Sequence, residues 1–299
     1  MKNIIIDTDP GKDDFLAILM LILSKKVNIQ AITTVMGNST LANVTANTQY
    51  LLDLTNSQIP IYSGSAQPLS RSFKPGNVMG KTGLTGVNVK PIKVVEGRAI
   101  ETLTALTQET DVLLLGPQTN LALALKKNPS LESKINSLVI MGGAINCPGN
   151  TNQYSEFNIF TDPEAARIVL ETSIPKVLIP LDICYQVPLY LSDFEQITNP
   201  KYSKIILNII KPYLKALAKY ENQNGAIVYD ALAAYYLLNQ NAFTLTPMNL
   251  SIETSNRNRL GQTIVNQDLP PNINVVTSLD KKKFVSDFIN IINIGAYYE

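Results

Sequence analysis

The chain has 299 residues, of which 45% are hydrophobic and 16% are charged, and its formal net charge is +1. This composition supplies a large apolar core and excludes extended disorder. The small net charge leaves no electrostatic footprint for nucleic acid or an anionic membrane, so neither is an expected partner. Cys147 and Cys184 are too few for a disulfide framework and indicate a reduced, cytoplasmic protein. No signal peptide or membrane-spanning run is apparent.

The first predicted elements are a short buried strand at residues 4–6 and a helix whose apolar run covers residues 15–23. The strand is β-branched and stops at the turn signal Pro10-Gly11. Around this turn lie four carboxylates, Asp7, Asp9, Asp13 and Asp14. In open α/β sheets, ligands bind at the carboxyl ends of the strands, which is where this cluster falls.

Four like charges within eight residues repel one another, and a hard divalent cation would offset that repulsion. Carboxylate oxygens suit Ca²⁺ or Mg²⁺. The alternative is a solvated acidic turn in which Asp13 caps the helix N-terminus.

Strand and helix patterns then alternate along most of the chain. Further strands are predicted at residues 29–35, 60–62, 111–115, 137–141 and 176–179, and helices at 40–54, 119–127, from Asp162-Pro163, at 201–220 and from Lys281. This rhythm predicts an α/β fold with a Rossmann-like, mostly parallel sheet and helices on both faces, in one domain covering residues 1–299. Two segments, 63–90 and 144–158, break the pattern, and long loops of this kind are often functional. Residues 248–276 receive no functional assignment.

Glycine-containing turns follow several of these strands. They are Gly37-Asn38, Gly116-Pro117 and Gly142-Gly143. Glycine lets the backbone approach a ligand closely. Each could be only a turn, but together they outline one rim at the sheet edge.

The segment Asp7-Thr8-Asp9-Pro10-Gly11-Lys12-Asp13-Asp14, followed by Ala17-Ile18, resembles the signature of the nucleoside hydrolases. The resemblance extends over about residues 4–238. It includes Met36-Gly37-Asn38, Leu115 to Ala122, Met141-Gly142-Gly143, Asn150, Glu156-Phe157-Asn158, Asp162 to Ala166 and Val228 to Ala234.

The resemblance implies one Ca²⁺ held by Asp9, Asp14, Asp230 and the Leu115 carbonyl, with Asp9 also the general base. It further implies a ribose pocket formed by Asp13, Asn38, Met141, Asn150, Glu156 and Asn158. On local grounds, two of these residues could have purely structural roles. Asp230 could cap a helix, and Met141 could be a core methionine.

Two positions depart from the family pattern. Many members have histidine before the last calcium-binding aspartate, and others have tryptophan, whereas this chain has Tyr229 and contains no histidine. Met79 replaces a second family histidine. The metal and ribose parts of the site therefore resemble the family, while the part facing the leaving base is altered. Tyr229 is predicted to complete the nucleobase pocket as a catalytic residue that stacks on the base and can donate a hydrogen bond or proton to it, and a core-packing aromatic is the alternative.

The predicted reaction is calcium-dependent hydrolysis of the N-glycosidic bond of ribonucleosides to ribose and free base. The expected role is nucleoside salvage by a cytoplasmic homo-oligomer, a dimer or a tetramer. Two other classes remain open at this point. One is a nucleoside- or ribose-binding protein without catalysis, and the other is a Mg²⁺-dependent phosphatase that uses an aspartate of Asp7-Thr8-Asp9 as nucleophile.

Overall fold

A sheet of eight strands lies at the centre of the computed structural model, which describes residues 1–72, 74–76, 78–107 and 109–295. The strand order is β3-β2-β1-β4-β5-β6-β12-β9. The strands are β1 (Lys2–Thr8), β2 (Val27–Thr34), β3 (Ile61–Ser63), β4 (Thr110–Leu114), β5 (Ile135–Met141), β6 (Lys176–Ile179), β9 (Phe243–Met248) and β12 (Ile273–Leu279). Every pair is parallel except β9 with β12. The predicted mostly parallel α/β sheet is confirmed.

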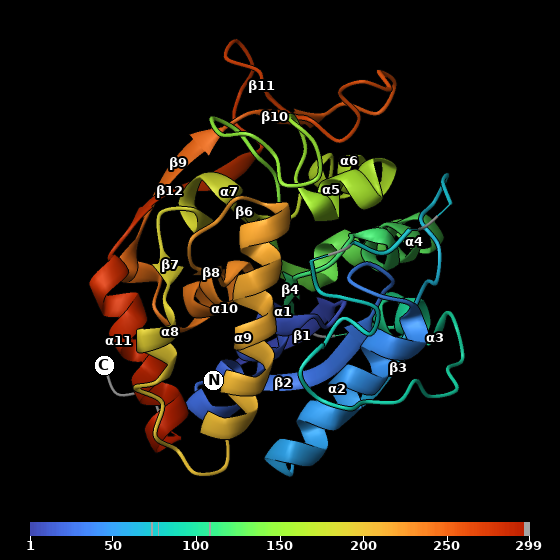
Figure 1. Cartoon of the computed structure of the whole chain (residues 1–299). Helices are drawn as coiled ribbons and strands as arrows, with labels where there is room; N and C mark the ends of the chain where they lie inside the picture. The colour runs from blue at the N-terminus through green and yellow to red at the C-terminus, as the bar shows by residue number, and fades with distance from the viewer. Residues whose placement is uncertain (73, 77, 108, 296–299) are drawn as a thin grey trace.

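Helices and short strand pairs surround this sheet (Figure 1). The helices are α1 (Lys12–Ser24), α2 (Leu41–Thr55), α3 (Arg98–Thr104), α4 (Thr119–Lys127), α5 (Phe157–Thr161), α6 (Pro163–Leu170), α7 (Leu181–Cys184), α8 (Leu191–Phe194), α9 (Ser203–Tyr220), α10 (Tyr229–Leu238) and α11 (Lys281–Ile294). Short antiparallel pairs join β7 (Pro188–Leu189) to β8 (Ala226–Ile227), and β10 (Leu250–Ile252) to β11 (Thr263–Val265). Residues 73 and 77, in the long loop predicted at 63–90, lie outside the described residues.

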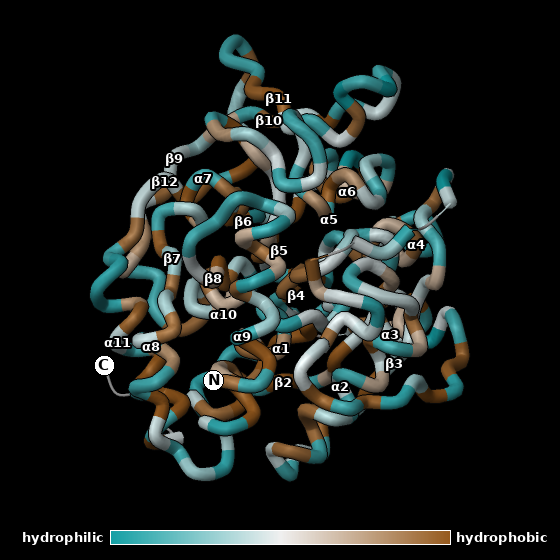
Figure 2. The backbone as a smooth tube through the Cα atoms, viewed as in Figure 1, coloured by the Kyte–Doolittle hydropathy of each residue, from teal (hydrophilic) through white to brown (hydrophobic). Residues whose placement is uncertain are grey.

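Successive residues of the central strands pack into two different cores, because side chains alternate between the faces of a sheet. Ile4 and Ile6 join a core that includes residues of α1, α9, α10 and α11. Ile5 joins a second core with residues of α3, α4 and α6. Figure 2 shows the hydrophobic segments concentrated in these inner layers and the hydrophilic ones in the outer loops. Helices on both faces are therefore confirmed.

The structure shows which residues cap the N-termini of helices α1, α6 and α10. Asp162 caps α6, since its Oδ1 accepts a hydrogen bond of 3.1 Å from the Ala165 N–H, as the sequence indicated. The N-cap of α1 is instead Gly11, and that of α10 is Val228. The N-cap roles considered for Asp13 and Asp230 are therefore wrong, and their carboxylates are available for other roles.

The carboxyl ends of four strands meet at one edge of the sheet. The register pairs Asp7 of β1 with Thr33 of β2 and with Leu114 of β4, and Leu114 in turn pairs with Ile140 of β5. The polar turns that follow these strands are consequently brought together. Within the described part of the chain, no helix combines the length and apolar character needed to cross a membrane.

Candidate active site

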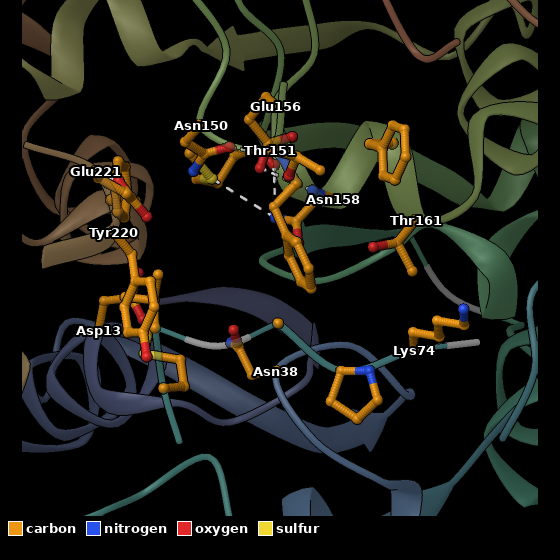
Figure 3. A pocket seen from close by; sticks show the side chains of 18 of the residues that line it. Asp13, Asn38, Lys74, Asn150, Thr151, Glu156, Asn158, Thr161, Tyr220 and Glu221 are labelled. Atoms are coloured by element: carbon orange, nitrogen blue, oxygen red, sulfur yellow. Dashed lines mark hydrogen bonds between the residues drawn. The ribbon is translucent and has the colours of Figure 1, made fainter. Parts of the chain in front are cut away.

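A cavity of about 610 Å³ opens at this edge of the sheet (Figure 3). It is lined by nine of the predicted site residues, Asp13, Asn38, Leu115, Met141, Asn150, Glu156, Asn158, Tyr229 and Asp230. Asp9 and Asp14 do not line it and are fully buried. The fold thus gathers residues from positions 13 to 230 around one space, whose volume is typical of a small-molecule site.

Asn38 connects the two fully buried carboxylates. Its backbone N–H donates to Asp9 Oδ2 at 2.5 Å, and its side-chain Nδ2 donates to Asp14 Oδ2 at 3.1 Å. Asp14 also accepts hydrogen bonds from the Thr8 hydroxyl at 2.5 Å and from the Gly11 N–H at 2.8 Å. These bonds fix both side chains. Asp9 Oδ1, in contrast, is buried without a hydrogen-bond partner in the described structure.

Three carboxylates form a compact group among the described residues. One oxygen each from Asp13, Asp14 and Asp230 lies within 4.8 Å of the others, and all three side chains are buried. We refer to them as the carboxylate triad. The resemblance implied Asp13 as a substrate contact and Asp9 as a ligand, whereas the triad contains Asp13 and not Asp9. Asp13 Oδ1, like Asp9 Oδ1, is buried without a hydrogen-bond partner in the described structure.

Burial raises the pKa of Asp9, Asp13, Asp14 and Asp230 above the usual carboxyl range. The negative charge of Asp14 raises the pKa of the other three further. Such a group cannot be fully ionised without a compensating positive charge. The all-oxygen donor set and the unpartnered oxygens fit a hard divalent cation, and they offer neither nitrogen nor sulfur for zinc.

Asp7, the fourth carboxylate of the motif, belongs to a different arrangement. Its Oδ1 accepts hydrogen bonds from the Thr33 hydroxyl at 2.5 Å and from Asn120 Nδ2 at 2.8 Å. It does not line the cavity. Asp7 thereby joins the ends of neighbouring elements, and the two aspartates of Asp7-Thr8-Asp9 do not form the paired site that the phosphatase alternative needs.

Asn158 and Glu156, which also line the cavity, form hydrogen bonds with the backbone around it. Asn158 Nδ2 donates to the Leu115 carbonyl at 2.8 Å, which orients the carbonyl implied as a calcium ligand. The Glu156 carboxylate caps α5, accepting from the N–H groups of Asn158 at 2.8 Å and Ile159 at 3.0 Å. Burial raises the Glu156 pKa to about 7, although these backbone hydrogen bonds lower it. Asn150 Oδ1 accepts from the Phe157 N–H at 2.9 Å.

Tyr229 lies at the cavity wall as predicted, but its hydroxyl is already engaged. It donates to Glu221 Oε2, and its ring meets Tyr185 edge-on with centroids 6.4 Å apart. Glu221 also lines the cavity and was not among the predicted residues. It directly follows α9, eight positions before Tyr229 in the sequence. No local sequence signal could have placed it against Tyr229.

Two glycines leave room for Asp9. A Cβ added at Gly37 would lie 2.0 Å from Asp9 Oδ2, and one added at Gly116 would lie 2.7 Å from Asp9 Oδ1. Neither glycine has a positive φ, so the requirement is space and not backbone conformation. The turn glycines after β2 and β4 therefore act as a cradle for this one carboxylate.

Gly37→Ala is expected to displace Asp9 and lower turnover by at least about tenfold, or 1.4 kcal/mol in activation free energy. Gly142→Ala is the matched control, because it also follows a strand at this edge and its added Cβ would approach nothing closer than 3.3 Å. Steady-state kinetics of both variants, with circular dichroism to verify folding, provides the measurement. Equal turnover in the two variants would contradict the role of this space.

Comparison with known proteins agrees with this geometry. The sequence profile of the family described as inosine-uridine preferring nucleoside hydrolase matches residues 4–286, and the chain belongs to that family. It is 33% identical over 302 residues to the pyrimidine-specific ribonucleoside hydrolase RihA of Shigella boydii serotype 4, covering 94% of this chain and 95% of that protein. It is therefore a hydrolase acting on N-glycosyl bonds.

Solved structures show the same relationship. The chain is similar to a purine-preferring ribonucleoside hydrolase from Gardnerella vaginalis, with a TM-score of 0.88, 26% identity and 98% of each chain covered. It is also similar to a plant nucleoside hydrolase, PpNRh1, with a TM-score of 0.89, 25% identity and coverage of 98% and 99%. RihA is described as pyrimidine-specific and the Gardnerella vaginalis enzyme as purine-preferring, so the family alone does not fix the base for this chain.

Proposed function

We propose that the protein hydrolyses ribonucleosides to ribose and free base in the cavity at the sheet edge, with the help of one Ca²⁺. The observation that carries the proposal is the buried acidic arrangement beside a cavity of about 610 Å³, with Asp9 Oδ1 and Asp13 Oδ1 lacking partners in the described structure. Burying ionised carboxylates without a counter-charge costs folding free energy, and a bound cation would supply that counter-charge.

The calcium ligands in this proposal are Asp9, Asp14, Asp230 and the Leu115 carbonyl, and Asp13 is near enough to Asp14 and Asp230 to contribute. Calcium accepts about 6–8 oxygens, so places remain for water and for sugar hydroxyls. When bound, the ion supplies positive charge that acidifies a water molecule and orients the hydroxyls of the substrate.

Asp9 is the proposed general base. Its Oδ2 is fixed by the Asn38 N–H, while its Oδ1 is free of protein hydrogen bonds in the described structure. That oxygen removes a proton from the water that attacks the anomeric carbon. As the bond to the base breaks, the sugar acquires positive charge, which the carboxylates of Asp13 and Glu156 stabilise.

The ribose pocket is proposed to consist of Asn38, Met141, Asn150 and Asn158, together with Asp13 and Glu156. All six line the cavity. Amide and carboxylate groups offer the donors and acceptors that sugar hydroxyls need. Asn150 and Asn158 are already oriented by hydrogen bonds to the backbone. This pre-organisation lowers the entropic cost of binding the sugar.

We also propose a role in nucleoside salvage, in the cytoplasm and as a homo-oligomer, with residues 1–299 forming one domain. Cys147 and Cys184 are unpaired, which is consistent with a reducing compartment.

A nucleoside panel tests the proposed reaction. Purified protein is incubated with inosine, adenosine, guanosine, uridine or cytidine, and reducing sugar is measured. At least one ribonucleoside is expected to release ribose, and its 2′-deoxy analogue at least about 100-fold more slowly, because a missing hydroxyl leaves buried polar groups unpaired. Nucleoside binding without base release would favour the binding-protein alternative. Phosphate release from a generic phosphomonoester would favour the phosphatase.

A further inference from the structure

Glu221 occupies an unusual position for a carboxylate at the end of a helix. It follows α9 and lines the cavity, on the same side as Tyr220 in Figure 3. Its Oε2 accepts a hydrogen bond from the Tyr229 hydroxyl. Tyr229 immediately precedes Asp230, a member of the carboxylate triad. The Glu221 carboxyl is therefore held beside the residue that stands where the family pattern has a base-facing side chain.

The other carboxylic side chains at the cavity already take part in other interactions. Among the described residues, the carboxylic side chains that line the cavity are Asp13, Glu156, Glu221 and Asp230. Asp13 and Asp230 belong to the triad. Both oxygens of Glu156 accept hydrogen bonds from backbone N–H groups. Glu221 Oε1, by contrast, receives no hydrogen bond within the described part of the chain.

The remaining proton donors at the cavity, Tyr220, Tyr229, Arg71 and Lys74, are less suitable. Tyr220 is about half exposed to solvent, and a phenol is a weaker acid than a carboxyl group. The Tyr229 hydroxyl is directed to Glu221. Arg71 forms an ion pair of 2.5 Å with Glu164, and an arginine does not release a proton near neutral pH. Lys74 is exposed to solvent. Glu221 thus combines a place at the cavity, a fixed orientation and an oxygen that accepts no hydrogen bond from another described residue.

We propose that Glu221 is the acid that protonates the departing nucleobase, and that Tyr229 is a positioning residue that holds it. The inference rests on the proposed nucleoside hydrolysis. A base that leaves as an anion is a poor leaving group, and proton donation to it in the transition state is general acid catalysis. In this arrangement, the Glu221 carboxyl and the Tyr229 phenol would together replace the missing histidines.

Proton transfer from Glu221 accompanies cleavage of the glycosidic bond. The Glu221 carboxyl proton moves to an acceptor atom of the base while the bond between the anomeric carbon and the base nitrogen breaks. The bonding electron pair stays with the base. Water adds to the anomeric carbon and gives its proton to Asp9. The products are ribose and neutral base, after which Glu221 takes a proton from solvent and Asp9 releases one.

The environment favours a protonated Glu221. Burial raises its pKa to about 7, the Tyr229 hydrogen bond lowers it, and the charge of Glu156 raises it. The titratable groups that face it are Tyr213 and Tyr220 of α9, Tyr229 of α10, Tyr185 beside α7, and Glu156 and Asp13 at the cavity. A substantial fraction of Glu221 therefore carries its proton at pH 7, and that fraction falls as the pH rises.

Glu221→Gln tests the proposal with two substrates, one whose leaving group needs a proton and one whose leaving group does not. Glutamine keeps the size and the acceptor for Tyr229 but has no acidic proton. Turnover of the best ribonucleoside is expected to fall at least about 100-fold, which is the usual range for a general acid. Turnover of 4-nitrophenyl riboside, whose leaving group needs no proton, is expected to change by less than about threefold. Glu195→Gln, at an exposed site outside the cavity, is the control variant.

Two further readouts separate catalysis from a structural role. Wild-type kcat for the nucleoside is expected to decline above about pH 7, and this limb should be absent with the aryl riboside. Tyr229→Phe is expected to lower kcat for nucleosides by up to about tenfold while sparing the aryl riboside.

Equal losses of Glu221→Gln on both substrates, or no loss on either, would overturn the assignment of Glu221 while the proposed function stands. If wild-type protein releases sugar from neither substrate, the proposed function fails, and this inference fails with it.

Discussion

Asp9→Asn is expected to lower kcat for every ribonucleoside by about 10²–10⁴-fold, the usual contribution of a general base. An amide cannot accept the proton of the attacking water, and it is a weaker ligand for calcium. The substitution should preserve the fold, because asparagine keeps an oxygen for the Asn38 N–H that now donates to Asp9 Oδ2. Initial-rate measurements of reducing sugar, with thermal melting to verify folding, provide the comparison.

Asp7→Asn is the matched control for this variant. Asp7 is a buried aspartate on the same segment, and its Oδ1 accepts from Thr33 and Asn120, so an asparagine oxygen can replace it. Its turnover is expected to remain within about tenfold of wild type. If Asp9→Asn retains more than about a tenth of wild-type turnover, Asp9 is not the base.

Removal of calcium is expected to abolish turnover and to destabilise the protein. The buried carboxylates of Asp9, Asp13, Asp14 and Asp230 repel one another without a cation. A ligand present at 100 times its Kd stabilises the folded state by about 2.7 kcal/mol. Calorimetry of chelated and calcium-restored protein should therefore show a higher Tm with calcium, and turnover should return with it.

Metal analysis provides the control for this experiment. Protein purified without added metal is expected to hold one calcium per chain, and Asp230→Asn should weaken its retention. Zinc in place of calcium, or full turnover after complete chelation, would contradict the assignment of the metal.

Much of the fold was predictable because its signals are local. The β-branched strands that end in Gly-containing turns, and the helices that follow them, are set by residue patterns within each segment. Helix α4 and strand β6 begin and end where the sequence predicted. The strand pair β10–β11, within residues 248–276, was not predicted, because the two strands are three residues each and pair only with one another.

Part of the candidate site could likewise be predicted from the sequence, and part could not. The motif around Pro10-Gly11 places its aspartates by spacing alone, so their gathering at the sheet edge could be predicted. Spacing did not reveal that the triad contains Asp13 and not Asp9, because that depends on side-chain direction. The pairing of Glu221 with Tyr229 depends on how α9 and α10 pack, and no pattern in either helix encodes it.

The ratio of ribose to free base released from one ribonucleoside, measured with and without calcium, tests the central claim most directly. Calcium-loaded protein is expected to release the two products in equal amounts, at a rate that added phosphate leaves unchanged, because water is the nucleophile. Chelated protein is expected to release neither. Products other than free ribose and base, or no product from any ribonucleoside with calcium bound, would contradict the account.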